Sequence, residues 1–279
     1  MSTPSEAVDR VLLRSWGLPD PGDSKKSRGQ VVVVGGSRRS PGAVLLSGEA
    51  TLRVGAGRLG LAVPASIEGA VGVALPEAAV FALPERATDR LGGRLRAQLE
   101  AADAVLVGPG FDDPDQTRDT LVAVAEVGVP VLVLDAFAIG VLPGLDRGIL
   151  PERLVLNVNA EEASILRGRD VDAGDLDALR DIAQRYRAVV NCYGAIVTAD
   201  GGCWEVPDGG PGLGTSGSGD VLAGAIAGFA ARGVEPERAA VWGSWAHARA
   251  GDRLEARTGL GFLARDLPAE LTLAIAEVG

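Results

Sequence analysis

A glycine-rich loop that leads into an apolar helix is the part of this sequence best suited to chemistry. The segment from Gly214 to Gly224 reads GTSGSGDVLAG. Unpaired backbone amides at a helix start bind anions, and glycines let phosphate groups approach them closely. Asp220 stands at the mouth of this loop, where a carboxylate can take a proton from a hydroxyl that attacks phosphorus. The loop therefore indicates phosphoryl transfer with Asp220 as the base, although Asp220 could instead simply cap the helix.

Two glycine-rich turns upstream each follow a buried β-branched or apolar run. GGS at 35–37 follows the run at 31–34, and GPG at 108–110 follows the run at 104–107. Ligands of open parallel sheets bind beyond the carboxyl ends of the strands. We therefore expect these turns to share a crevice with the later loop.

Two matches to the glycine pattern of dinucleotide-binding folds are rejected. The match at 55–60 ends a helix and begins a strand, which is the reverse of the order that a pyrophosphate site needs. The match at 212–217 precedes a helix, but no further strand follows to carry a ribose-binding carboxylate. The first match is interpreted as a turn, and neither predicts a Rossmann site.

Rare residue types exclude several mechanisms. His247 is the only histidine, and Lys25 and Lys26 are the only lysines. A Walker A loop, a histidine-based zinc protease site and a late Schiff-base lysine are therefore absent. Cys192 and Cys203 fit neither a zinc cluster nor a secreted disulfide framework, and no metal-ligand set is predicted. His247 is interpreted as a packed helical residue, and Cys192 as a strand filler.

The composition of the chain excludes some classes of binding partner. It has 279 residues, 47% of them apolar, and a net charge of −10, so nucleic acid would be repelled. Its uncharged stretches fall short of the roughly 18 apolar residues that a membrane span needs. No secretory signal is recognised, and a cytoplasmic location is the expectation.

Strand and helix patterns alternate along most of the chain, which predicts a parallel α/β fold. Predicted strands lie at 31–34, 58–63, 104–107, 131–134 and 154–156, and predicted helices at 40–54, 115–127, 161–167 and 176–185. Short β-rich runs at 188–204 predict an antiparallel edge. Three helices are expected at 218–232, 236–257 and 264–278. No linker interrupts the chain, so residues 1–279 are expected to form one domain, with an extension or helix at 1–23.

Several segments, in order, carry a family resemblance. "GQVVVVGGSRRSPGA", "AVLVGPG", "VLVLDAFA", "LNVNAEEASILRG" and "GTSGSGDVLAGAIAGFAARG", followed by "HARAGD" and "GFLARDLP", resemble the ADP/ATP-dependent NAD(P)H-hydrate dehydratases, which are relatives of the ribokinases. The resemblance implies a three-layer α/β/α ribokinase-like fold with a mostly parallel central sheet. It also implies repair of hydrated NADH or NADPH: a nucleotide phosphorylates the added hydroxyl, and elimination restores the nicotinamide.

The resemblance also implies roles for individual residues. Asp220 would be the catalytic base and would contact the hydrated dinucleotide. The remaining substrate-binding positions would be Ala43, Gly110, Asn159 and Glu162, and the nucleotide-binding positions Cys192, Tyr193, Gly194, Ser218 and Gly219. ADP or ATP is the expected co-substrate, with Mg²⁺ on its phosphates. A homo-oligomer is expected.

The chain departs from the family pattern at three places. The family histidine in T-P-H-P-G-E is Asn159 here, and an amide can donate a hydrogen bond but carries no charge. The family's K-G is Cys192-Tyr193, which predicts weaker nucleotide binding. D-A-D-A-L keeps its first carboxylate as Asp135 and loses the second at Phe137.

Two alternatives remain open from the sequence. A small-molecule kinase of the ribokinase superfamily would share the Asp220 loop but would release a phosphorylated product. A diverged, non-catalytic homologue would bind a dinucleotide without turnover, as the changes at Asn159 and Cys192 allow.

Overall fold

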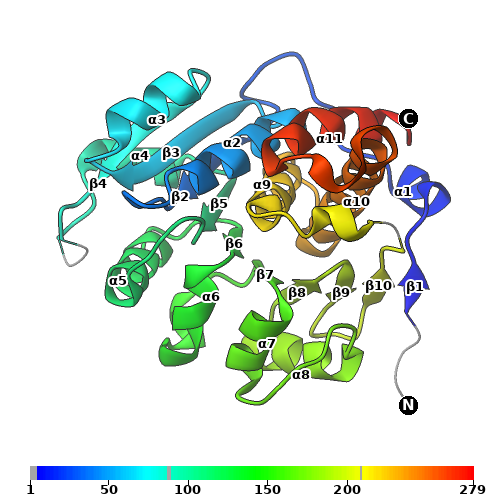
Figure 1. Cartoon of the computed structure of the whole chain (residues 1–279). Coiled ribbons are helices and arrows are strands. Elements are labelled where there is room, and N and C mark those ends of the chain that lie inside the picture. Colours follow the sequence, from blue (N-terminus) through cyan, green and yellow to red (C-terminus); the bar gives the residue numbers. More distant parts are fainter. Residues whose placement is uncertain (1–4, 87–88, 208) are drawn as a thin grey trace.

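The strands of the protein form one mostly parallel sheet of ten strands (Figure 1). The structure is a computed structural model that describes residues 5–86, 89–207 and 209–279. The spatial order is β1-β10-β9-β8-β7-β6-β5-β2-β3-β4, and only β9 runs antiparallel to its neighbours, β8 and β10. The strands are β1 (Glu6–Ala7), β2 (Gln30–Val34), β3 (Arg58–Pro64), β4 (Ala79–Leu83), β5 (Ala104–Val107), β6 (Leu132–Leu134), β7 (Leu154–Val158), β8 (Val189–Cys192), β9 (Ala195–Val197) and β10 (Cys203–Glu205).

Helices cover both faces of the sheet, as the three-layer α/β/α prediction requires. One face packs against α1 (Arg10–Trp16), α2 (Gly42–Arg53), α3 (Glu68–Ala74), α9 (Ser218–Ala231), α10 (Pro236–Thr258) and α11 (Leu267–Ala276). The other packs against α4 (Gly93–Glu100), α5 (Pro114–Ala125), α6 (Phe137–Val141), α7 (Ala160–Arg167) and α8 (Leu176–Tyr186). No helix in the described residues is long and apolar enough to cross a bilayer.

The central strand β2 shows why its sequence is continuously apolar. Val31 and Val33 point into the core beneath α2 and α9, whereas Val32 and Val34 point into the core beneath α4 and α5. Successive side chains of a strand alternate between faces, and both faces are buried here. The prediction of a doubly buried parallel strand is confirmed.

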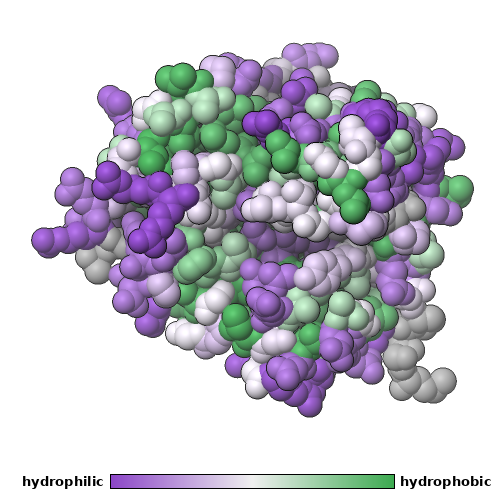
Figure 2. All heavy atoms as spheres, viewed as in Figure 1, coloured by the Kyte–Doolittle hydropathy of each residue, from purple (hydrophilic) through white to green (hydrophobic). Residues whose placement is uncertain are grey.

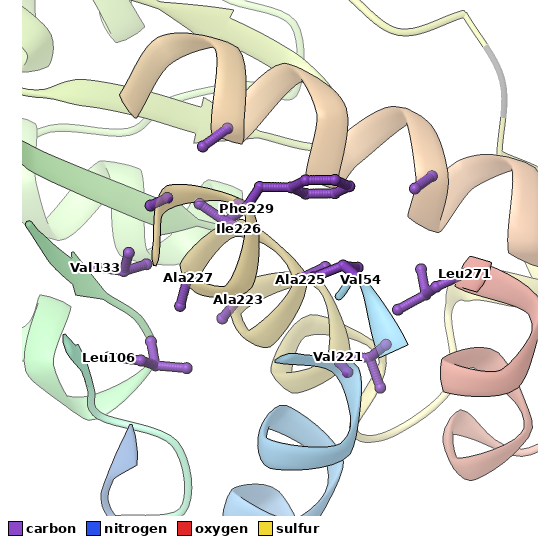
Figure 3. Packing of buried hydrophobic residues seen from close by; sticks show 14 of the residues in the cluster. Val54, Leu106, Val133, Val221, Ala223, Ala225, Ile226, Ala227, Phe229 and Leu271 are labelled. Atoms are coloured by element: carbon purple, nitrogen blue, oxygen red, sulfur yellow. The ribbon is translucent and has the colours of Figure 1, made fainter. Parts of the chain in front are cut away.

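Helix α9 lies at the centre of one layer, in very close contact with α2. A Cβ atom at Gly224 would lie 2.1 Å from the carbonyl oxygen of Ser47, so only glycine allows this approach. The Thr51 hydroxyl also donates to the Gly224 carbonyl at 3.1 Å. Figure 3 shows Leu106 and Val133 of the sheet facing α9 from one side. The packing fixes the direction of α9, and with it the place of its first turn.

The antiparallel edge predicted at 188–204 is confirmed, but it is not the outermost part of the sheet. Strand β1, only two residues long, pairs in parallel with β10 beyond it. Nearby, Trp16 of α1 meets Trp204 edge to face, with 6.1 Å between ring centroids. Such a short strand leaves no alternating pattern in the sequence, which explains why only an extension or helix was expected there.

Three further elements, α3, β4 and α4, were not predicted from the sequence. Helix α3 reads EGAVGVA, and its glycine and valine residues have low helix propensity. Strand β4 is an edge strand with mostly exposed or half-buried residues, so it lacks the buried run that marked the central strands.

Candidate active site

A pocket of about 600 Å³ lies beyond the carboxyl ends of β6, β7 and β8, beside the first turn of α9. Figure 2 shows a recess near the centre of the face seen in Figure 1. Its lining includes Asp135, Asn157, Asn159, Glu162, Tyr193, Gly194, Ser218, Gly219, Asp220, Ser244 and His247, together with the loop at 209–214. Most of the predicted site residues are therefore brought together.

Asp220 is the third residue of α9 and lines the pocket. The residue at the N-cap is Gly217, with a φ of 90°, and in the described residues no side chain makes a capping hydrogen bond to the backbone at this helix start. The alternative that Asp220 merely caps the helix therefore finds no support. Burial raises the pKa of Asp220 to about 6. At neutral pH the group is mostly ionised yet a stronger base than an exposed aspartate.

Ser218 and Gly219 form the wall of the pocket beside Asp220. A Cβ at Gly219 would meet no atom within 4 Å, so this glycine borders open space. Ser218 Oγ and His247 Nε2 are hydrogen-bonded at 2.9 Å. Burial lowers the pKa of His247 to about 4, so the imidazole is neutral near pH 7. The packed, hydrogen-bonded role expected for His247 is confirmed.

Asn159 and Glu162 form a capping box at the start of α7. Asn159 Oδ1 accepts a hydrogen bond from the Glu162 amide at 2.9 Å, and Glu162 Oε2 accepts one from the Asn159 amide at 2.9 Å. The N-x-x-E spacing is a sequence signal for this motif that the sequence analysis did not use. Burial raises the pKa of Glu162, against the effect of the Asn159 amide. Both side chains line the pocket while holding the helix start in place.

Asp135 follows β6 and receives a hydrogen bond from Asn157 of β7. Asn157 in turn accepts from Asn191 of β8, which accepts from Ser244 of α10. Burial raises the pKa of Asp135 well above its usual range, and the nearby charges of Asp220 and Glu162 raise it further. The sequence analysis noted Asp135 but missed the other three. For Asn157 and Asn191 the available signal was a polar residue within an otherwise apolar buried strand, and Ser244, in the helix α10, has no such signal.

Tyr193 and Gly194 form the two-residue turn between β8 and β9, and both line the pocket. Their φ angles are 49° and 82°, as a tight hairpin turn requires. Cys192 pairs with Ala195 across this turn, but its side chain is buried in the core under α7 and α8 and does not line the pocket. Burial raises the pKa of its thiol to about 11. The structure therefore separates Cys192 from its two neighbours in the predicted nucleotide-binding set.

Ala43 and Gly110 lie side by side, outside the lining of this pocket. Gly110 has a φ of 76°, and a Cβ there would lie 2.9 Å from the Ala43 Cβ. The Gly36 amide donates to the Pro109 carbonyl at 2.7 Å, so the two upstream glycine-rich turns meet. Neither turn lines this pocket, and the crevice that they were expected to share with the loop before Asp220 stays a prediction. A Cβ at Gly108 would lie 1.8 Å from the Asp135 carbonyl oxygen, which places the GPG turn against the edge of the pocket.

The loop at 209–214 is tied to α10 by two carboxylates. Asp252 Oδ1 accepts a hydrogen bond from the Gly209 amide at 3.2 Å, and Glu255 Oε2 accepts one from the Gly212 amide at 3.2 Å. Sequence reasoning did not find this pair, because the residues that meet are more than forty positions apart.

The family model described as NAD(P)H-hydrate dehydratase matches residues 31–273. The chain belongs to this family. It is 44% identical to the ADP-dependent (S)-NAD(P)H-hydrate dehydratase of Xanthomonas campestris, over 95% of this chain and 94% of that one. It is 33% identical to the bifunctional NAD(P)H-hydrate repair enzyme Nnr of Moorella thermoacetica, over 90% of this chain but only half of that protein.

The fold is also similar to a solved NAD(P)H-hydrate dehydratase. The ADP/ATP-dependent enzyme of Bacillus subtilis, co-crystallised with ATP and Mg²⁺, aligns with a TM-score of 0.85 at 23% identity and covers the whole of both chains. A ribokinase-like superfamily protein of Enterococcus faecalis aligns with a TM-score of 0.86 at 26% identity, over 99% of this chain and 96% of that one, which confirms the ribokinase-like fold class.

Proposed function

We propose that the protein uses ADP or ATP to dehydrate hydrated NADH or NADPH back to the reduced coenzyme. Membership of the NAD(P)H-hydrate dehydratase family and the 44% identity to an ADP-dependent member support this assignment. The observation that carries it is the Asp220 carboxylate, half-buried in a pocket at the start of a helix, with its pKa raised to about 6.

In this proposal Asp220 is the base of the phosphoryl-transfer step. It removes the proton from the added hydroxyl while that oxygen attacks the terminal phosphorus of the nucleotide. The amides of Ser218 and Gly219, at the positive end of α9, would stabilise the phosphoryl oxygens. Gly219 borders open space, so phosphates can approach these amides.

The other pocket residues divide between the two ligands. Tyr193 and Gly194 would border the nucleotide, with Cys192 acting only as support behind the turn. The hydrated dinucleotide would contact Asn159 and Glu162. It would extend toward the adjoining site of Ala43 and Gly110.

Magnesium would enter as part of the nucleotide complex. In the ranges that the structure describes, no three His, Cys, Asp or Glu side chains gather as a metal site. Mg²⁺ commonly takes most of its ligands from phosphates and water, so this pocket fits an ion carried by the nucleotide. The ion would neutralise charge on the transferring phosphoryl group.

The protein is also proposed to be cytoplasmic and to form a homo-oligomer. Both cysteines are free and buried, which fits a reducing compartment such as the cytoplasm. Leu260, Leu263 and Leu273 are exposed near the C-terminus and would suit a contact between copies of the chain. Cell fractionation and sedimentation test these two points.

The decisive experiment is turnover of hydrated NADH and hydrated NADPH with ADP and with ATP. Recovery of the absorbance of the reduced nicotinamide, together with release of phosphate, supports the proposal. A stable phosphorylated product without recovery would favour the kinase alternative. Binding of both ligands without any turnover would favour the non-catalytic homologue.

A further inference from the structure

Four buried polar side chains form an unbroken series of hydrogen bonds along the pocket, with Asp135, Asn157 and Ser244 in its lining and Asn191 behind them. Ser244 Oγ donates to Asn191 Oδ1 at 3.0 Å, Asn191 Nδ2 donates to Asn157 Oδ1 at 2.7 Å, and Asn157 Nδ2 donates to Asp135 Oδ1 at 2.8 Å. All four residues are buried. They come from α10 and from three neighbouring strands or strand ends, so the chain crosses the sheet.

Burying these polar groups costs free energy, and the need to fill the core does not explain why they are there. Amides and hydroxyls in a buried strand are tolerated only when they are hydrogen-bonded, and apolar residues would fill these positions without that requirement. Each donor in the chain points toward Asp135. The Asn157 amide occupies Oδ1 of Asp135, so a proton on this carboxyl group is directed to the other oxygen, Oδ2.

The proposed reaction needs proton transfer at a second stage. After phosphorylation, the C–O bond to phosphate breaks with its electron pair going to phosphate, while the ring nitrogen lone pair forms a C=N bond. The neighbouring C–H bond then breaks, and its electrons form the ring C=C bond and return the lone pair to nitrogen. This stage needs an acid for the departing phosphate and a base for the ring proton.

We propose that Asp135 is the acid and base of the elimination stage, and that Asn157, Asn191 and Ser244 are positioning residues that hold it. The inference rests on the proposed function. Asp135 gives its proton to the departing phosphate oxygen, and the resulting carboxylate takes the ring proton. The residue therefore ends in its starting state, and the phosphate leaves with one additional proton.

The surroundings of Asp135 agree with this role. Burial raises the pKa of Asp135, and the negative charges of Asp220 and Glu162 raise it further, so the group favours its protonated form. The pocket histidine, His247, is neutral and supplies no opposing charge. A carboxyl group whose protonated form is favoured suits the role of an acid beside the base Asp220.

The test separates the two stages in a single turnover. Rapid-quench measurements follow nucleotide cleavage, and absorbance follows recovery of the reduced nicotinamide. In Asp135→Asn, whose amide oxygen can still accept from Asn157, we expect cleavage to stay within a few-fold of wild type. We expect recovery to fall by about 10² to 10⁴-fold, with accumulation of the phosphorylated intermediate.

Ser244→Ala is a milder second variant that removes the far end of the chain. We expect it to slow recovery several-fold without slowing cleavage, and Ser244→Thr, which keeps the hydroxyl, to restore the rate. The matched control is Thr117→Val on α5. Thr117 is also buried and also makes a side-chain hydrogen bond, to the Asp113 carbonyl at 2.6 Å, but it does not line the pocket. In Thr117→Val, the rates of nucleotide cleavage and of nicotinamide recovery should both equal those of the wild type.

Three results would overturn the inference: equal losses in cleavage and recovery, a fall in cleavage that added Mg²⁺ reverses, or unchanged recovery in Asp135→Asn. A wild-type protein that neither cleaves nucleotide nor restores the nicotinamide would instead refute the proposed function. Melting temperatures of all variants distinguish these results from failure to fold.

Discussion

Ser218 Oγ and His247 Nε2, 2.9 Å apart, join the first residue of α9 to the middle of α10. The neutral imidazole of His247 therefore holds Ser218, which lies two residues before Asp220. The contact connects the stability of the fold directly with the shape of the proposed phosphate site.

We expect the stability of the protein to depend on His247 below pH 6.5. An unfolded histidine takes up a proton near pH 6.5, whereas the folded pKa is lowered to about 4. The unfolded state therefore binds more protons between these values, and stability falls as pH falls, by at most about 1.4 kcal/mol per pH unit. Melting temperatures of His247→Gln should lack this part of the pH dependence. Parallel curves for the two proteins would contradict the assignment.

Asp220→Asn should abolish turnover and raise the melting temperature at pH 7. Removal of a positioned base lowers a rate by about 10² to 10⁴-fold. The pKa of Asp220 is raised from 3.8 to about 6, so ionising it in the folded state costs stability that is lost as pH rises through this interval. Asparagine avoids that loss. Activity of the wild type should rise with pH and level off above about pH 6.

The control for Asp220→Asn is Asp115→Asn, because Asp115 also lies in the first turn of a helix, α5, but outside the pocket. It should leave turnover unchanged. A lower melting temperature for Asp220→Asn at pH 7 would mean that the carboxylate makes a stabilising contact, and activity within a few-fold of wild type would remove it from the base role.

Gly219→Val should weaken nucleotide binding more than binding of the hydrated dinucleotide. The added side chain enters open space, so the fold is retained, but it stands between the helix amides and an approaching phosphate. Calorimetric titration of each ligand measures the two affinities. Gly93→Val, in the first turn of α4 and also bordering open space, is the matched control and should change neither. Equal losses for both ligands would place the phosphates elsewhere.

Cys192→Ala should keep turnover and nucleotide affinity within about two-fold of wild type, because the side chain lies in the core and not in the pocket lining. The melting temperature should fall slightly, since a small buried group is lost. In the native protein, alkylating reagents should modify this thiol slowly, because burial raises its pKa to about 11. Rapid labelling at neutral pH, or a large loss of nucleotide affinity, would show that Cys192 reaches the ligand.

Local signals made part of this structure predictable. The apolar run of β2 and the glycine-rich loop before Asp220 can each be recognised from a few neighbouring residues. Edge strand β4 and helix α3 carry weak local signals, and tertiary contacts decide them. The hydrogen-bonded series from Ser244 to Asp135 could not be predicted from the sequence, because it depends on the order of the strands and on the packing of α10 against the sheet.

Helix α10 contacts three parts of the site. Its Ser244 donates to Asn191 in the hydrogen-bonded series that ends at Asp135, and its His247 binds Ser218 at the start of α9. Its Asp252 and Glu255 accept hydrogen bonds from the loop at 209–214. Three parts of the site are therefore attached to one helix. A small tilt of α10 would move all three parts together and preserve the spacing between them. The shape of the pocket should therefore change less on substitution of the outer surface of α10 than on substitution of a residue that bonds α10 to one of these three parts.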